Sequence, residues 1–156
     1  MITMTPIGVV RATRTAAKDD EWDAVASSIE LDVSVVSGDA ILELETFSHI
    51  EIVFVFDRVD PENIERGARH PRNNQAWPKV GILAQRAKMR PNRIGTTICR
   101  LDKVEHGPAP RLHVTGMDAI DGTPVLDIKP WVREFGPRGE VRQPEWMTEL
   151  MKRYWT

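Results

Sequence analysis

The sequence predicts an all-β protein: a single β-barrel of six to eight short strands, with a long basic loop and a C-terminal helix. Apolar residues mostly alternate or form short β-branched runs, turn signals separate these runs, and no long helical segment lies between them. A doubly wound α/β fold would need such helices. With 156 residues, 41% of them hydrophobic and 28% charged, the chain has the size and composition of one globular domain.

The first half of the chain contains four candidate strands. Ile7–Val10 is a short β-branched run, and Ser28–Val36 alternates well enough for a half-buried strand. Gly38-Asp39 supplies a turn, after which Ile41–Glu45 fits either a strand or a short helical turn. Ile50–Phe56 is the clearest central strand, because it is β-branched and aromatic and carries a single charge.

A long loop follows the central strand. Val59–Pro78 is rich in proline, glycine and asparagine, which predicts a loop with one helical turn at Glu62–Arg66. Val80–Gln85 is predicted as the next strand, and the turn Arg90-Pro91-Asn92 leads into a strand over Ile94–Val104. Long loops inside compact domains are usually functional or disordered, so this loop is a candidate for a functional role.

The last third contains two strands and a helix. Arg111–Gly116 alternates, Asp121-Gly122 is a turn signal, and Val125–Ile128 is a short strand. Pro144 begins a predicted helix in which Trp146, Leu150 and Tyr154 share a face. We therefore expect one domain over residues 1–156, with its core at about 6–131 and a helical tail at about 144–154.

Positive charge is concentrated in residues 66–101. This segment holds nine basic side chains and no acidic one, whereas the rest of the chain carries 12 basic and 23 acidic groups and the formal net charge is only −2. A solvated surface neutralised by acids elsewhere is the simple explanation. Seven of the nine are arginines, whose planar guanidinium matches carboxylate and phosphate, so an anionic ligand is the competing explanation. Nucleic acid, a nucleotide or an amino-acid carboxylate would qualify.

Several functional classes are excluded. The chain has no glycine-rich dinucleotide or P-loop motif, no HExxH, no CxxC and no GxSxG. Its single cysteine, Cys99, rules out an internal disulfide, and its four histidines lack metal-ligand spacing, so we expect no metal. No apolar run approaches the length of a membrane span, and the N-terminus lacks the pattern of a secretory signal. The cytoplasm is the expected compartment.

Three segments combine chemically active residue types. Phe47-Ser48-His49-Ile50 places two polar residues before the most hydrophobic strand, RAKMRPNRIG (86–95) contains a Pro-Asn turn, and DGTPVLDIKPW (121–131) carries Asp127 and Lys129 on one strand face. Each has a structural alternative: a hydrogen-bonded histidine, an ordinary turn between strands, and an ion pair at a sheet edge.

Taken together and in this order, FSHIEIVFVF, RPNRIG and DGTPVLDIKPW resemble the TsaA-like family, the tRNA methyltransferase O proteins. The opening Ile7-Gly8-Val9-Val10-Arg11 resembles the family's first strand, and the resemblance extends from about Pro6 to Trp131. The sequence departs from the family at Arg93, where proline is usual, and over residues 16–27. Longer family members also carry a further C-terminal domain.

This resemblance implies S-adenosylmethionine as methyl donor, held by a β-barrel, usually in a homodimer. It also implies methylation of the exocyclic nitrogen of threonylcarbamoyl-adenosine 37 in the tRNA anticodon loop, with Asp127 and Lys129 as catalytic residues that orient or deprotonate the carbamoylated amine. The basic segment would contact phosphates, with Arg72, Lys79, Arg90 and Asn92 facing the substrate. The cofactor residues implied by the resemblance are Ala12, Thr13, Arg14, Ser48, His49, Arg69, Arg86, Thr115, Gly116, Met117 and Asp118.

Two other functions remain open from the sequence. The chain could transfer the same methyl group to another RNA or to a small metabolite, or it could be a non-catalytic RNA-binding barrel. Only Trp77 lies within the basic stretch as a platform for base stacking, which favours capture of one nucleotide over binding of a long single strand.

Overall fold

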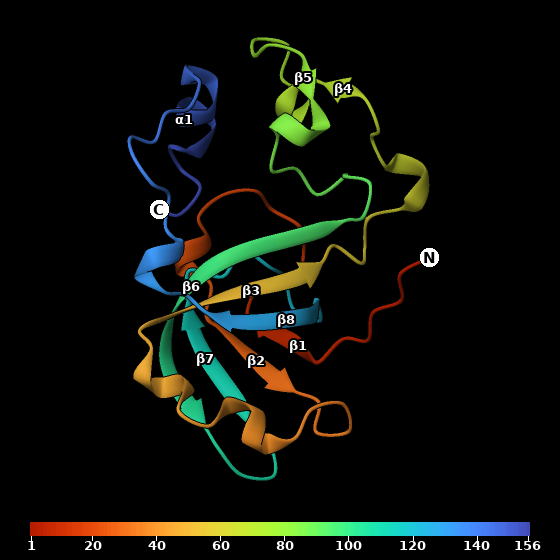
Figure 1. Ribbon diagram of the computed structural model, residues 1–156. Helices are drawn as coiled ribbons and strands as arrows, with labels where there is room; N and C mark the ends of the chain where they lie inside the picture. Colours follow the sequence, from red (N-terminus) through yellow and green to blue (C-terminus); the bar gives the residue numbers. More distant parts are fainter.

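The computed structural model describes residues 1–156 and contains a closed six-stranded antiparallel barrel (Figure 1). The strand order around the barrel is β1-β2-β7-β6-β3-β8. A separate two-stranded sheet consists of β4 (Ala68–Arg69) and β5 (Val80–Gly81). The six barrel strands are β1 (Gly8–Ala12), β2 (Ser27–Leu31), β3 (His49–Val55), β6 (Ile94–Glu105), β7 (Arg111–Thr115) and β8 (Pro124–Pro130).

The helical elements are short. The one α-helix, α1, spans Glu145–Met151, and no helix of the structure is both long and apolar enough to cross a bilayer. The 3₁₀-helices are η1 (Trp22–Ala24), η2 (Gly38–Ile41), η3 (Leu44–Thr46), η4 (Pro61–Asn63), η5 (Pro71–Asn73), η6 (Ile82–Ala84) and η7 (Arg133–Phe135). The predicted all-β barrel with a long basic loop and a C-terminal helix is therefore confirmed.

The barrel interior is filled by alternate residues of its strands. In β3, Ile50, Ile52 and Phe54 are buried while the intervening residues point outward, as the period of two in a strand requires. The core consists of Val10, Ile29, Ile41, Ile50, Ile52, Phe54, Cys99, Leu112, Val114, Met117, Ala119 and Val125. Burial raises the pKa of the Cys99 thiol, with the charges of Asp118 and Asp102 adding to the effect, so this cysteine is an unreactive core residue.

The DGTP segment closes the barrel. Gly122 has a φ of 85°, which favours glycine, and its N–H donates to the carbonyl of Val10 at 2.8 Å. The carboxylate of Asp121 accepts from the N–H of Ala12 at 3.0 Å. These contacts join the turn before β8 to the end of β1, and they explain the turn signal in the sequence.

Two predicted strands are wrong in part. Of the predicted strand Val80–Gln85, only Val80–Gly81 (β5) is a strand, and η6 follows. Ile82 and Gln85 are buried and Leu83 is exposed, and buried positions three residues apart suit a 3₁₀-helix. The amide of Gln85 donates to the carbonyls of Arg69 and Val80, both at 3.0 Å, and holds this turn. Ser28–Val36 is a strand only to Leu31, because Asp32 accepts hydrogen bonds from Ser34 and turns the chain. Ile41–Glu45 adopts the helical alternative.

Residues 56–93, which we call the arm, connect β3 to β6 and contain η4, β4, η5, β5 and η6. In Figure 1 the arm and α1 both lie beyond the same end of the barrel, and α1 sits beside the β4–β5 sheet in that view. The expected long loop is thus a folded excursion with its own short sheet. The helical turn expected at Glu62–Arg66 is shorter and begins earlier, as η4 over Pro61–Asn63, and the chain is extended again at Ile64.

The arm ends at Arg93, which has a φ of 53°. Its N–H donates to the carbonyl of Arg90 at 2.9 Å, and its guanidinium donates to the carbonyl of Val59 at 3.0 Å. Proline has a fixed φ near −65° and no N–H, so it could not adopt this conformation. The Arg-Pro-Asn turn of this chain therefore differs in backbone conformation from one that carries proline at the same position.

Gly95 provides a test of packing where the arm meets the barrel. A Cβ at this position would lie 2.5 Å from two ring atoms of the buried Phe54 and 2.9 Å from Phe56. We expect Gly95→Ala to lower the free energy of unfolding by about 1–3 kcal/mol, the usual cost of overpacking a core. Urea denaturation measures this effect. Gly81→Ala is the matched control, because no atom lies within 4 Å of its added Cβ; equal stability of the two variants would contradict the packing argument.

Candidate functional site

A large cavity, of about 1390 Å³, lies between the arm, the barrel and the C-terminal segment. The barrel contributes residues of β3 and β6, including Phe54 and Thr97, and the loop after β1 contributes residues 15–19. The arm contributes its basic residues, and the C-terminal segment contributes residues of α1 and the two aromatic residues that follow it. Four parts of the chain that are distant in sequence therefore share one cavity.

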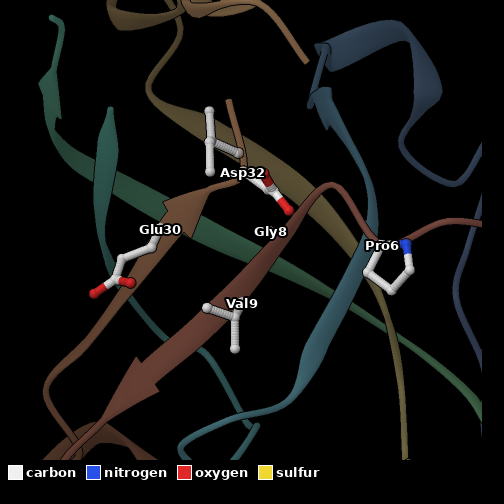
Figure 2. Close-up of a pocket in the computed structure, with 6 residues that line it drawn as sticks. Pro6, Gly8, Val9, Glu30 and Asp32 are labelled. Atoms are coloured by element: carbon white, nitrogen blue, oxygen red, sulfur yellow. The ribbon is translucent and has the colours of Figure 1, made fainter. Parts of the chain in front are cut away.

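A second hollow, of about 300 Å³, is lined by Pro6, Gly8 and Val9 together with Glu30, Leu31 and Asp32 (Figure 2). Its charged side chains are both carboxylates, and Glu30 is already paired with Arg111 and Arg11. This hollow does not suit an anionic ligand. The larger cavity is therefore the candidate site.

Arginines of the arm line one side of the large cavity. Arg72 is paired with Asp20 at 3.0 Å. Arg69 faces no carboxylate: one terminal nitrogen donates to the sulfur of Met89 at 3.0 Å, and its buried Nε has no partner. Arg90 donates to the carbonyl of Gln85 at 2.7 Å. Arg69 and Arg90 therefore retain unneutralised charge at the cavity, which suits a carboxylate or a phosphate.

A carboxylate held by two hydroxyl groups lies at the barrel side of the cavity. The hydroxyl of Thr97 donates to Oδ1 of Asp118, and the hydroxyl of Tyr154 donates to Oδ2. Burial raises the pKa of Tyr154, and the neighbouring charge of Asp118 raises it further. The phenol therefore remains protonated and acts as a hydrogen-bond donor to the carboxylate.

Opposite charges are held close together without pairing. Arg86 donates to the carbonyl of Thr96 at 2.8 Å, and the next residue along β6, Thr97, holds Asp118. Arg86 and Asp118 form no ion pair with each other, although both line the cavity. A guanidinium and a carboxylate kept apart in one cavity can bind the two charges of a zwitterion such as an amino acid.

Aromatic residues also line the cavity. Trp146, Tyr154 and Trp155 come from the C-terminal segment, and the rings of Tyr154 and Trp155 meet edge to face with centroids 5.1 Å apart. Backbone bonds dock this segment on η1, since the N–H groups of residues 21–23 donate to the carbonyls of residues 153–155 at 2.8–3.0 Å. The cavity thus contains both cationic and aromatic side chains, the two kinds of group that a nucleotide requires.

The structure brings five of the expected site residues together and distributes the others elsewhere. Arg69, Arg72, Arg86, Arg90 and Asp118 line the cavity. Lys79 and Asn92 are exposed residues of the arm outside its lining. Ser48 and His49 contact each other at 2.7 Å at the start of β3 and do not line the cavity, whereas Glu51, Phe54 and Phe56 further along do.

Expected cofactor residues near the barrel ends have partners within the protein. Thr115 donates to Asp102 at 2.6 Å, Gly116 makes a turn with a φ of 84°, and Met117 is buried in the core. The N–H groups of Ala12 and Thr13 bond to Asp121 and Ala26. Arg14 lies 4.4 Å above the ring of Trp22 and donates to the carbonyls of Asp20 and Glu21, so it shapes the cavity wall formed by η1.

Asp127 and Lys129 form an ion pair of 3.2 Å on the outer face of β8. Neither lines the cavity, but Lys129 is the cross-strand partner of Glu51, which does. The pair therefore lies one strand away from the cavity. The ion pair that the sequence analysis gave as the structural alternative is therefore present. Asp127 and Lys129 lie beside the cavity and not in its lining.

Sequence reasoning missed Thr97, Tyr154, Trp146 and Trp155 as site residues. The periodicity did identify the face shared by Trp146, Leu150 and Tyr154. It could not distinguish a face that packs on the core from one that lines a cavity. The signal available in the sequence was the concentration of aromatic residues in the last eleven positions, which include the only tyrosine.

Comparisons with known proteins agree with this architecture. The model of the tRNA-methyltransferase O N-terminal domain matches residues 13–136. A tRNA (adenine(37)-N6)-methyltransferase of Mus musculus is 43% identical over 96 residues, which cover 62% of this chain and 21% of the mouse protein. A probable S-adenosyl-L-methionine-binding protein of Pyrococcus abyssi is 36% identical over 145 residues, which cover 91% of this chain and 74% of that protein.

The crystal structure of TrmO from Pseudomonas aeruginosa superposes with a TM-score of 0.71 at 29% identity, covering 92% of this chain and 61% of that one. The chain spans about a fifth of the length of the mouse relative. The resemblance inferred from FSHIEIVFVF, RPNRIG and DGTPVLDIKPW is confirmed. The family model matches most of the chain, and the archaeal relative aligns over nearly all of it, so this chain belongs to the tRNA-methyltransferase O N-terminal domain family.

Proposed function

We propose that this chain is an S-adenosylmethionine-dependent methyltransferase that acts on N6 of threonylcarbamoyl-adenosine 37 in the tRNA anticodon loop. The names of its relatives support the reaction and the donor. The cavity, at about 1390 Å³, exceeds the range of about 300–1,000 Å³ typical of a site for one small ligand, so it has room for a donor and an acceptor nucleoside together.

The separation of Arg86 and Asp118 is the observation that carries the proposal. S-adenosylmethionine supplies a methyl group activated on a positively charged sulfur, and its amino-acid tail carries one carboxylate and one ammonium group. Arg86 would bind the carboxylate and Asp118 the ammonium, because each charge is available to a ligand. Arg69, which lines the cavity and pairs with no carboxylate, would supply a second cation for the same carboxylate. The apolar residues of the C-terminal segment would contact the adenine.

The acceptor nitrogen must gain a methyl group and lose a proton. The adjoining carbonyl of the carbamoyl group makes that proton easier to lose, so positioning can supply much of the rate. We propose that Asp127 and Lys129 bind the acceptor at the rim of the cavity, beside Glu51, and orient the amine. Arg90, Arg72 and Asn92 would contact the nucleotide from the arm.

Exposed basic residues of the arm would contact phosphates of the anticodon loop. Arg66 and Lys79 are exposed, and residues 66–101 contain no acidic side chain. The family resemblance also supports a homodimer. A tRNA substrate supports the cytoplasm as the compartment.

The proposed activity is tested with purified protein, S-adenosylmethionine and tRNA that carries threonylcarbamoyl-adenosine 37. We expect nucleoside mass spectrometry to detect a product 14 mass units heavier, the mass of one CH₂ group, and no product with tRNA that lacks the threonylcarbamoyl group. Calorimetry with S-adenosylmethionine completes the test. Binding without methylation of this tRNA would assign another acceptor, and absence of binding would leave a non-catalytic barrel.

Arg86→Met tests the donor site. Loss of a charge-assisted hydrogen bond to the carboxylate is expected to weaken S-adenosylhomocysteine binding about tenfold, as measured by calorimetry. Arg66→Met removes an equivalent charge from the arm outside the cavity lining and should leave the affinity near that of the wild type. Equal loss in both variants would mean that the general charge of the arm, and not a specific contact, attracts the ligand.

Lys79→Glu tests the contact with tRNA. Because each phosphate contact releases counterions, this variant should weaken tRNA binding and reduce the slope of log K against log salt by about 1, while S-adenosylmethionine binding is unchanged. Filter binding at several salt concentrations measures both quantities. Lys103→Glu, toward the other end of β6, is the control. Parallel loss of tRNA and donor binding in Lys79→Glu would contradict the division of roles.

A further inference from the structure

One polar atom of the C-terminal segment, the hydroxyl oxygen of Tyr154, contacts Asp118 of the proposed donor site. Tyr154 lies outside residues 13–136, the range matched by the family model, and its hydroxyl donates to Oδ2 of Asp118. Its own backbone is fixed on both sides: its N–H donates to the carbonyl of Met151 at 3.1 Å, and its carbonyl accepts from Trp22 at 3.0 Å. The phenol therefore occupies a defined position in the cavity wall.

The two hydroxyl groups together determine the orientation of Asp118. Thr97 binds Oδ1 from the barrel and Tyr154 binds Oδ2 from the tail, so rotation of the carboxylate would break at least one hydrogen bond. Each carboxylate oxygen accepts more than one hydrogen bond, which leaves acceptor capacity for a ligand. A carboxylate fixed in this way is preorganised to receive a donor such as an ammonium group.

We propose that Tyr154 is a positioning residue that, by holding Asp118, makes the site selective for ligands with an amino-acid tail. This inference rests on the proposed function, since it assumes that Asp118 receives the ammonium group of the donor. Tyr154 acts through Asp118 and takes no proton from the acceptor, because its buried phenol stays protonated.

Docking of the C-terminal segment does not depend on the Tyr154 hydroxyl. Three backbone hydrogen bonds join residues 21–23 to residues 153–155. Arg153 forms an ion pair with Glu21 at 2.8 Å, and the indole N–H of Trp77 donates to Glu149 at 2.8 Å. Removal of the hydroxyl should therefore leave the segment in place, which separates a positioning role from a structural one.

Tyr154→Phe removes only this hydroxyl, and calorimetry with two ligands measures the result. S-adenosylhomocysteine carries the amino-acid tail, whereas 5′-methylthioadenosine has the same nucleoside without it. We expect Tyr154→Phe to bind S-adenosylhomocysteine about tenfold more weakly, the effect of one hydrogen bond to a charged group, and to bind 5′-methylthioadenosine as the wild type does. Arg153→Met removes the exposed ion pair with Glu21 but leaves the three backbone hydrogen bonds that hold Tyr154, so it should bind S-adenosylhomocysteine like the wild type.

A double-mutant cycle with Asp118→Asn checks the route of the effect. In the Asp118→Asn background, Tyr154→Phe should cause little further loss of S-adenosylhomocysteine affinity, because both changes act on the same contact. The proposal would be overturned if the affinity losses of the two single variants multiplied in the double variant. It would also be overturned if Tyr154→Phe weakened binding of both ligands equally, or if Arg153→Met weakened S-adenosylhomocysteine binding as much as Tyr154→Phe does. Failure of the wild type to bind S-adenosylhomocysteine would instead overturn the proposed function itself.

Discussion

Closure of the barrel by β8 is the constraint on which the site depends. β8 pairs with β3 along most of its length and with β1 through Gly8 and Val9, so the sheet has no free edge between its first and last strands. The turn before β8 is tied to β1 by Asp121 and Gly122. Asp118 lies in the segment just before that turn. Closure keeps this segment beside β6 and so brings Asp118 to Thr97.

The arm and the C-terminal segment convert this end of the barrel into a cavity. An open barrel end would leave Asp118 to solvent, where a carboxylate discriminates poorly between ligands. The arm contributes guanidinium groups to the lining, and the tail contributes aromatic rings. Each surface alone would be unremarkable: an exposed basic loop attracts any polyanion, and an apolar helix face packs on any hydrophobic surface. In the proposed function, selectivity comes from their combination around Asp118.

The charges of the cavity are arranged to remain available. Several arginines of the arm bond to main-chain carbonyls, as Arg86 does to Thr96 and Arg90 does to Gln85, and a carbonyl orients a guanidinium without neutralising it. Asp118 is oriented in the same way by hydroxyl groups instead of by a cation. Arg72 is the exception, since Asp20 neutralises it. This pattern of oriented but unpaired groups is what distinguishes a binding site from a solvated charged surface.

The sequence by itself determined the barrel, most of its strands and the family. A β-branched and aromatic run identifies β3, alternation of apolar residues identifies β7, and the Asp-Gly turn precedes β8, because these features follow from local backbone geometry and from burial. The segments DGTPVLDIKPW and RPNRIG carried the family resemblance, and the excess of arginine in residues 66–101 indicated an anionic ligand. Local signals also failed where tertiary contacts prevail: Gln85 bonds across the arm and turns a predicted strand into η6.

Only the tertiary structure decided which of these residues meet. Ser48 and His49 come just before Glu51, which lines the cavity, but neither of them lines it, and no local pattern distinguishes the three. Tyr154 and Asp118 are 36 residues apart and nothing in either local sequence predicts their contact. Such contacts depend on how the barrel closes and where the tail docks, which are properties of the whole chain and not of any segment.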